Sequence, residues 1–300
     1  MKNSSKSLTR RVLLKNAGLA AGAGLVAPAL SAAAAGAQVS GSAHANSSKR
    51  ALVLCSDRSH NSDEIHMALG RLFRDLNMPV DFTIEYEKLS RSLLSNYQLF
   101  VAFRNGVTWP NGYPTKDVYS PPGGKPPVGV AWMTDEQAQA VQDFVKAGNG
   151  LYAYHNSDIM GTTSKGFREL IGGNQFLGHP PIRPFRVRPT ANKHPITDGI
   201  TEFWVQDEQH YVAYDKDPKY VILEAENMDG IPWIQRPDDL EATVEIPPGN
   251  YGTKSISGYA YDYGNGRVVY TAVGHTFHAL WTPQYYEIQK RSVKWLLKEL

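Results

Sequence analysis

The feature that most constrains the fold is a short apolar run, Gly150 to Tyr154, that ends on His155. An amphipathic stretch from Thr134 to Ala147, closed by Gly148, precedes this run. Helix, glycine and apolar strand in this order are typical of one half of a βαβ unit, in which the strand is covered on both faces. We therefore predict an α/β fold with a mostly parallel central sheet. His155 then follows the carboxyl end of a strand, where such sheets bind their ligands; the alternative is a core or helix-capping histidine.

The first 37 residues predict an export signal. Five basic residues precede an Ala/Gly-rich run, and segment 9–15 (Thr-Arg-Arg-Val-Leu-Leu-Lys) resembles a twin-arginine signal followed by small residues suited to cleavage. A membrane anchor is less favoured because the run is weakly hydrophobic and contains Pro28. We expect a twin-arginine signal peptide over 1–37, a flexible linker over 38–49 and one domain over 50–300. The expected partner is the twin-arginine translocase, the expected location is periplasmic or secreted, and the mature chain should have no stable membrane span.

Composition and charge exclude several classes of protein. Of the 300 residues, 42% are hydrophobic and 11% aromatic, which is enough for a large core and excludes a disordered chain. Loss of the five basic residues of the signal turns the formal net charge of +2 into −3. Since no cluster of basic and aromatic residues occurs elsewhere, we expect no nucleic-acid partner. The single cysteine, Cys55, excludes an intrachain disulfide and lies in a predicted strand, where a buried thiol is more common than a nucleophile.

Apolar runs and helical periodicity predict the remaining elements. The predicted strands cover 50–56, 80–86, 99–103, 150–155, 185–188, 220–225, 257–263 and 267–273, with a hairpin turn at Gly264-Asn265-Gly266. The predicted helices cover 63–76, 134–147, a segment through 167–171, and 285–300. The Pro/Gly/Tyr-rich segment 105–128, with Trp109, Tyr113 and Tyr119, predicts a lid or rim over the ligand crevice.

Polar side chains follow several predicted strands. Asp57 and His60 follow the first, Arg104 the third, His155 the fourth and His275 the last. The carboxyl ends of parallel strands meet at one edge of a sheet, so these side chains should converge. Imidazole and carboxylate groups suit one divalent ion (zinc, manganese or iron), although no His-x-x-x-His helix or cysteine pair fixes the spacing. No Gly-x-Gly-x-x-Gly turn supports a nucleotide, and no Gly-x-Ser-x-Gly elbow supports a serine hydrolase.

Four stretches together resemble the ThuA-like (trehalose utilisation) family: 150–155, 176–179, Asp207-Glu208 with Tyr211, and 266–275 followed by Trp281 and Pro283. The resemblance covers about 50–300 and implies the flavodoxin-like, three-layer sandwich of the class I glutamine amidotransferases. His155 and Asn156 occupy the position of the amidotransferase cysteine, so amidotransferase chemistry is not expected. The resemblance implies sugar catabolism, in particular a small carbohydrate substrate such as a trehalose-like or 3-keto glycoside.

These residues lead to specific site predictions. The predicted metal ligands are His155, His179, Glu208 and His275. The predicted catalytic residues are His60, Asp57, His155 and Glu208, and the predicted substrate-binding residues are Arg104, Trp109, Tyr211 and Trp281. The leading hypothesis is a metal-assisted lyase, hydrolase or isomerase that acts on a glycoside. The alternatives are a non-catalytic sugar-binding module and a metal-free hydrolase that uses Glu208 and Asp57 as a carboxylate pair.

Overall fold

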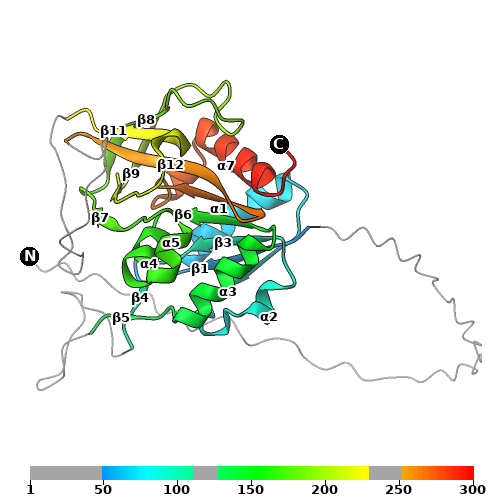
Figure 1. The fold of residues 1–300 in the computed structure, drawn as a ribbon. Helices are drawn as coiled ribbons and strands as arrows, with labels where there is room; N and C mark the ends of the chain where they lie inside the picture. Colours follow the sequence, from blue (N-terminus) through cyan, green and yellow to red (C-terminus); the bar gives the residue numbers. More distant parts are fainter. Residues whose placement is uncertain (1–48, 111–127, 230–251) are drawn as a thin grey trace, which may run out of the picture. The chain divides into compact units, whose positions relative to one another are not determined.

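The structure is a computed structural model that describes residues 49–110, 128–229 and 252–300 (Figure 1). The strands of its central sheet are β1 (Ala51–Cys55), β2 (Val80–Thr83), β3 (Leu99–Phe103), β6 (Gly150–Tyr154), β8 (Arg183–Pro189), β9 (Phe203–Asp207), β11 (Val221–Glu226), β12 (Lys254–Tyr263) and β13 (Gly266–Thr271). Two short pairs are β4 (Val107–Thr108) with β5 (Val130–Ala131) and β7 (Phe176–Gly178) with β10 (Tyr211–Val212). The helices are α1 (Ser62–Asp75), α2 (Arg91–Leu94), α3 (Asp135–Lys146), α4 (Ser157–Thr163), α5 (Lys165–Leu170), α6 (Phe277–Leu280) and α7 (Pro283–Leu296).

The order of the described strands in the central sheet is β2-β1-β3-β6-β13-β12-β11-β8-β9. The first five strands in this order are parallel to their neighbours, and the other four continue the sheet with antiparallel pairings. Because antiparallel pairing reverses direction at each step, only β12 and β8 oppose the rest. The prediction of an α/β fold with a mostly parallel sheet is confirmed.

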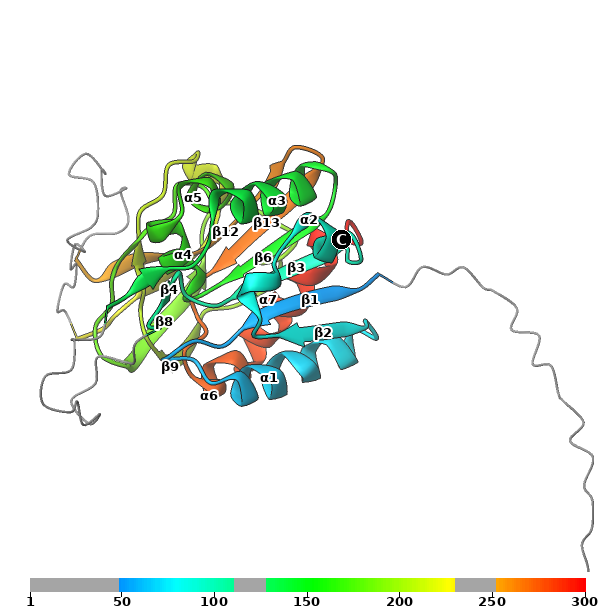
Figure 2. The ribbon, with the colours of Figure 1, turned by 90° about the horizontal axis from the view of Figure 1, so that it is seen from below.

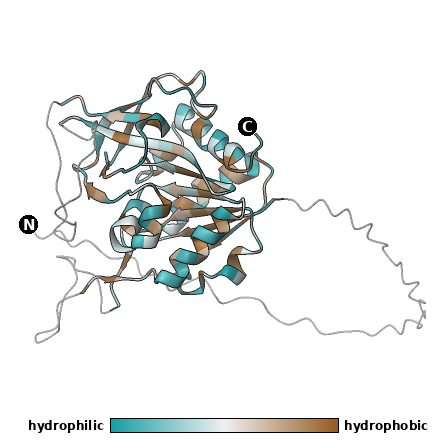
Figure 3. Ribbon diagram, viewed as in Figure 1, coloured by the Kyte–Doolittle hydropathy of each residue, from teal (hydrophilic) through white to brown (hydrophobic). Residues whose placement is uncertain are grey.

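Helices cover both faces of the sheet and make three layers. Figure 2 shows α2, α3, α4 and α5 on one side and α1, α6 and α7 on the other. Alternate residues of each strand point to opposite faces, so Val53 of β1 packs in the core under α1 and α7, and Leu54 packs in the core under α3. This double burial explains the continuous apolar runs, which Figure 3 shows as brown strands between two-coloured helices.

Local sequence signals fix several element boundaries. The predicted capping box of α3 is present: Thr134 Oγ1 accepts from Gln137 N, and Gln137 Oε1 accepts from Thr134 N. Asn61 caps α1 by accepting from Asp63 N at 2.8 Å. The predicted hairpin is also confirmed, since β12 and β13 pair in antiparallel register around a turn in which Gly264 has a positive φ of 60°.

Other elements differ from the predictions. The predicted strand 80–86 ends at Thr83, and a 3₁₀ turn, Tyr86–Lys88, replaces its last residue. Strands β4, β5, β7, β9 and β10 and helices α2, α4 and α6 were not predicted. Of the predicted lid, 111–127 (with Tyr113 and Tyr119) lies outside the described residues, as do 1–37 and all but residue 49 of the predicted linker.

The antiparallel half of the sheet curls back toward the parallel half. Three strands separate β9 from β13 in the sheet order. Nevertheless, Asp207 at the end of β9 accepts hydrogen bonds from the backbone amides of Gly274, His275 and Thr276, just after β13. This contact brings Glu208, the next residue, to the carboxyl edge of the parallel strands. In the described part of the chain, no helix is both long enough and apolar enough to cross a membrane.

Candidate functional site

His155 occupies the sharp turn between β6 and α4. Its φ of 34° lies in the left-handed region, a conformation that costs a non-glycine residue roughly 1–2 kcal/mol. Its backbone amide donates to Thr271 O at 2.7 Å, and its Nδ1 donates to Ala272 O at 2.6 Å. A carbonyl oxygen can only accept, so the proton lies on Nδ1 and Nε2 keeps its lone pair. Nε2 is buried, has no hydrogen-bond partner among the described residues, and faces Glu208 Oε2 at 3.5 Å.

His60, in the loop after β1, is oriented by Asp57. Its Nδ1 lies 2.8 Å from Asp57 Oδ1, and its Nε2 lies 3.2 Å from Nδ1 of His275. The other oxygen of Asp57 accepts from Asn105 N at 3.0 Å and from Asn156 Nδ2 at 2.5 Å. Asp57 is thus fully engaged with its own neighbours and fixes the ring of His60.

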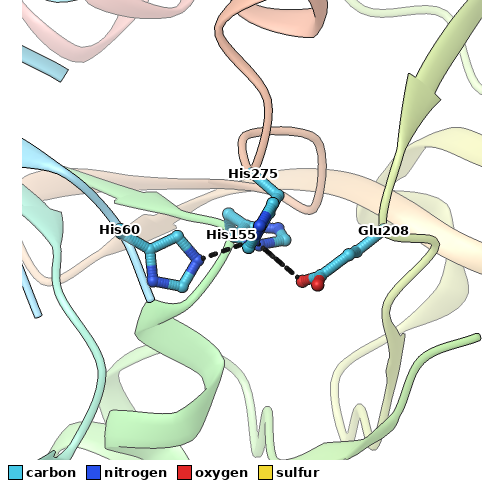
Figure 4. Close-up of side chains that lie close together, drawn as sticks. All are labelled: His60, His155, Glu208 and His275. Atoms are coloured by element: carbon cyan, nitrogen blue, oxygen red, sulfur yellow. Dashed lines mark hydrogen bonds and ion pairs between the residues drawn. The ribbon is translucent and has the colours of Figure 1, made fainter. Parts of the chain in front are cut away.

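Glu208 and His275 meet because Asp207 holds the loop after β13. Nδ1 of His275 lies 3.0 Å from Glu208 Oε2, closer than the contacts of that oxygen with His155, His179 and His210. Figure 4 shows Glu208 approaching from one side of the cluster and His60 from the other, with His155 and His275 between them. Donor atoms of His60, His155, Glu208 and His275 all lie within 4.8 Å of one another.

Two further histidines face the same carboxylate oxygen. Nε2 of His179, after β7, lies 3.7 Å from Glu208 Oε2, and Nε2 of His210, before β10, lies 3.5 Å from it. Nδ1 of His179 donates to Pro180 O at 2.8 Å, and Nδ1 of His210 lies 2.6 Å from Asp158 Oδ2. The site predictions named neither His210 nor Asp158. The spacing of Glu208 and His210, two apart as on one side of an extended segment, was the available signal for His210.

Burial opposes charge in this cluster, and neighbouring charges decide several pKa values. Burial and the nearby His210 lower the pKa of His155 well below its usual range, and the same two causes lower the pKa of His179. Burial alone would lower the pKa of His210 too, but Asp158 and Glu208 raise it to about 9. Burial would raise the pKa of Glu208, but the imidazoles of His155, His210 and His275 around it hold it far below its usual range. At neutral pH, Glu208 is therefore ionised, and His155 and His179 are neutral.

The predicted metal ligands are all close to Glu208, but they fall into two groups. His155 and His275 group with Glu208 and His60, whereas His179 groups with Glu208 and His210. His60 was predicted as a base beside the metal and lies within ligand distance of the first group. The metal and catalytic assignments remain predictions.

Arg104 and Trp109 lie beside this cluster, at a neighbouring cavity. Their cavity has a volume of 380 Å³ and is also lined by Asp57, Arg58 and Tyr86. The Arg104 guanidinium donates to Ser56 O and stacks on the Tyr86 ring at 4.4 Å. Asp57 therefore contacts both the cavity and His60, whereas none of the described histidines lines the cavity.

Tyr211 and Trp281, the other predicted substrate-binding residues, make contacts within the protein. The Tyr211 side chain is fully buried, and its hydroxyl donates to Gly252 O at 2.9 Å. Trp281 packs on Phe277, with ring centroids 4.1 Å apart, and on the guanidinium of Arg71. Their predicted roles in substrate binding remain predictions.

The donor set fits a divalent ion. Nitrogen lone pairs of anchored imidazoles and one carboxylate are ligands of zinc, manganese and iron. A hydrogen bond from the second ring nitrogen to a carboxylate or carbonyl is the usual support of a metal-binding histidine, and His60, His155, His179 and His210 each have this arrangement. The buried Nε2 of His155, which has no hydrogen-bond partner among the described residues, could donate its lone pair to such an ion.

Comparison with known proteins gives one family. The sequence model described as "ThuA: Trehalose utilisation" matches residues 50–296. No curated protein matches the chain significantly. Among solved structures, a ThuA-like protein from Bacteroides uniformis is 15% identical, with a TM-score of 0.54 over 83% of this chain and 91% of that one. At this identity the likeness concerns the fold.

Two further solved structures are more distant. A glutamine amidotransferase from Thermotoga maritima is 11% identical, with a TM-score of 0.44 over 84% of this chain and 99% of that one. A β-galactosidase from Rahnella sp. R3 is 10% identical, with a TM-score of 0.48 over 84% of this chain and 32% of that one.

Proposed function

The chain belongs to the ThuA family of trehalose utilisation, and on that premise we propose that it acts on a glycoside with the help of a divalent metal ion. His155, Glu208 and His275 would hold the ion and leave a position open for substrate, as catalytic metal sites with three protein ligands do. The ion would supply a Lewis acid for a substrate oxygen.

One observation carries the proposal. The Nδ1 protons of His155 and His179 are donated to carbonyl oxygens, so their Nε2 lone pairs face the ionised carboxylate of Glu208 at 3.5 and 3.7 Å. Lone pairs that face each other repel, and burial strengthens the repulsion. A cation between the nitrogen and oxygen atoms removes it.

The remaining groups suit a sugar substrate. A ketone at C3 of a glycoside makes the C2 proton acidic, and removal of that proton allows the C1 substituent to leave. His60, whose ring is oriented by Asp57, a residue that lines the 380 Å³ cavity, would serve as the base. Arg104 and Trp109 would contact the sugar ring. We propose trehalose-like or 3-keto glycosides as the substrate class.

The alternatives have less support. A metal-free carboxylate pair would need Asp57 and Glu208 to face one substrate, but both oxygens of Asp57 are engaged, and the chain of contacts to Glu208 runs through His60 and His275. A binding module alone would not need five imidazoles around one carboxylate.

Elemental analysis of the purified protein tests the proposal. We expect a stoichiometric divalent metal in the wild type, and loss of metal in His155→Ala and His275→Ala, with a thermal midpoint close to that of the chelator-treated wild type. His194→Ala is the matched control, because His194 packs on Trp295 and lies near Arg267, at the far end of β13 from the site. Full metal content and normal turnover of a 3-keto glycoside in the site variants would refute the proposal. A large fall in midpoint without loss of turnover would indicate core histidines instead.

We also propose export by the twin-arginine route, from segment 9–15. Arg10→Lys combined with Arg11→Lys should leave the protein in the cytoplasm, as fractionation and immunoblotting would show. An unchanged periplasmic or secreted yield would contradict this.

A further inference from the structure

We propose that the site is a two-ion centre in which the Glu208 carboxylate bridges a second ion held by His179 and His210. The proposal rests on the function proposed above, since it extends the same metal site. Two sets of donors exist, each with atoms within 4.8 Å of one another: His60, His155, Glu208 and His275 form one, and His179, Glu208 and His210 form the other. The two sets share only Glu208.

The number of donors exceeds what one ion needs. A catalytic ion takes about three protein ligands and keeps one position open. Five imidazoles and one carboxylate surround this site, which is enough for three ligands to each of two ions when Glu208 serves both. In the first set, His155, His275 and Glu208 supply three ligands, and His60 remains as the base. In the second set, His179, His210 and Glu208 supply three.

Buried hydrogen bonds also orient a histidine of the second set. His210 is 2% exposed, and its Nδ1 lies 2.6 Å from Asp158 Oδ2. The same carboxylate oxygen accepts from Tyr270 OH at 3.0 Å, and the Asp158 and Tyr270 side chains are fully buried. A buried carboxylate that orients an imidazole is a common support of a metal ligand.

The small sheet of β7 and β10 places the second set. Tyr211 of β10 pairs with Gly178 of β7. The residues next to this pair, His210 and His179, therefore lie beside each other, with ring centroids 5.2 Å apart and planes 19° apart. The ring of His210 also lies 3.8 Å from that of His155, which joins the two sets.

Two bridged ions would select a class of substrate. Ions about 3.5–4 Å apart bind two oxygens at once. Neighbouring oxygens on one ring, such as a hydroxyl beside a ketone, have the required spacing. We therefore expect a vicinal hydroxy-ketone or diol of a sugar to bind across the pair, and a substrate that lacks one of these oxygens to bind less tightly.

Metal titration of the full chain tests the second ion. The protein is stripped with a chelator, dialysed and titrated with Mn²⁺; bound equivalents are counted by calorimetry and elemental analysis, and the EPR spectrum reports whether the ions are coupled. We expect two equivalents and a coupled spectrum in the wild type, and one equivalent with an isolated-ion spectrum in His179→Ala and His210→Gln. His194→Ala should retain two equivalents. If His210→Gln does not fold, His179→Ala decides, because that side chain is 32% exposed.

The outcomes separate the two proposals. One equivalent in the wild type, unchanged in His179→Ala, would overturn the second ion and leave the one-ion function standing. No bound Mn²⁺ and no bound Zn²⁺ in the wild type would overturn both.

Discussion

Gly274 has a position that leaves no room for a side chain. A Cβ atom there would lie 2.8 Å from the Cβ of His155 and 3.3 Å from Cζ of Phe103. Its amide donates to Asp207 Oδ2 at 2.7 Å, in the contact that holds the loop carrying His275. The close approach of this loop to His155 therefore depends on glycine.

Gly274→Ala should destabilise the protein by about 1–3 kcal/mol, because the added methyl group must push the loop away from His155. It should also weaken metal binding, since His275 moves with the loop. Gly70→Ala is the matched control: Gly70 lies inside α1, and the nearest atom to an added Cβ is 3.8 Å away. The control should be neutral or stabilising by up to about 1 kcal/mol. Equal urea midpoints for the two variants would contradict the prediction.

His194 should make stability depend on pH. Burial and the charge of Arg267 lower its pKa from 6.5 to about 4. Because the folded pKa is depressed, the unfolded chain binds more protons between these values. The corresponding stability is present above pH 6.5 and is lost as pH falls toward 4. In urea unfolding, the wild type should therefore lose more free energy of unfolding than His194→Gln as the pH falls from 6.5 to 4. Parallel pH curves for the two proteins would rule out this role.

At the scale of elements, the parallel half could be predicted from the sequence and parts of the antiparallel half could not. The strands β1, β3, β6 and β13 are buried on both faces and give continuous apolar runs. In contrast, β9 alternates between buried and exposed residues, with Trp204 52% exposed, and was missed. β7 and β10, with three and two residues, are too short for any periodicity.

The difference between the parallel and antiparallel halves also explains which site residues could be predicted. His155 and His275 directly follow predicted strands, so their convergence could be inferred. The approach of Glu208 depends on the curl of the sheet, which no local pattern encodes. His210 depends on the pairing of β7 with β10, which becomes visible only in three dimensions.

The cap of α3 offers a test at this scale. Thr134→Ala should cost about 1 kcal/mol, because Gln137 N loses its acceptor at 3.2 Å. Thr282→Ala is the comparison, since Thr282 precedes α7 but makes no side-chain cap hydrogen bond. The Thr134 variant should lose roughly 2–4 °C in thermal midpoint, while the Thr282 variant and the metal content of both should change little. A larger loss in the Thr282 variant would contradict this account.

At the scale of the whole molecule, the candidate site joins the two halves of the sheet. His60, His155 and His275 follow parallel strands, whereas Glu208 follows β9 at the antiparallel end. An ion held by both halves would bind the folded state and not the unfolded chain, so its binding free energy would add to stability.

Metal removal should therefore lower the thermal midpoint. At a free metal concentration of one hundred times Kd, binding adds about 2.7 kcal/mol, which corresponds to roughly 5–10 °C for a domain of this size. Calorimetry with and without a chelator measures the shift, and His155→Ala should show little of it. A midpoint that is the same with chelator and with excess metal would exclude a structural link through the ion.

The contact between His60 and His275 also has a consequence in time. These residues are 215 positions apart, and a ribosome adds about 5–20 residues per second, so a nascent chain exposes the first for ~10–40 s before the second exists. Throughout that interval no complete cage is available to select an ion. The choice of metal ion is therefore made by the fully folded chain, from the ions present in the compartment where it folds. If the chain crosses the membrane already folded, the ions of the cytoplasm, where it folds, determine which metal it binds. The ions of the compartment to which it is exported then have no part in the choice.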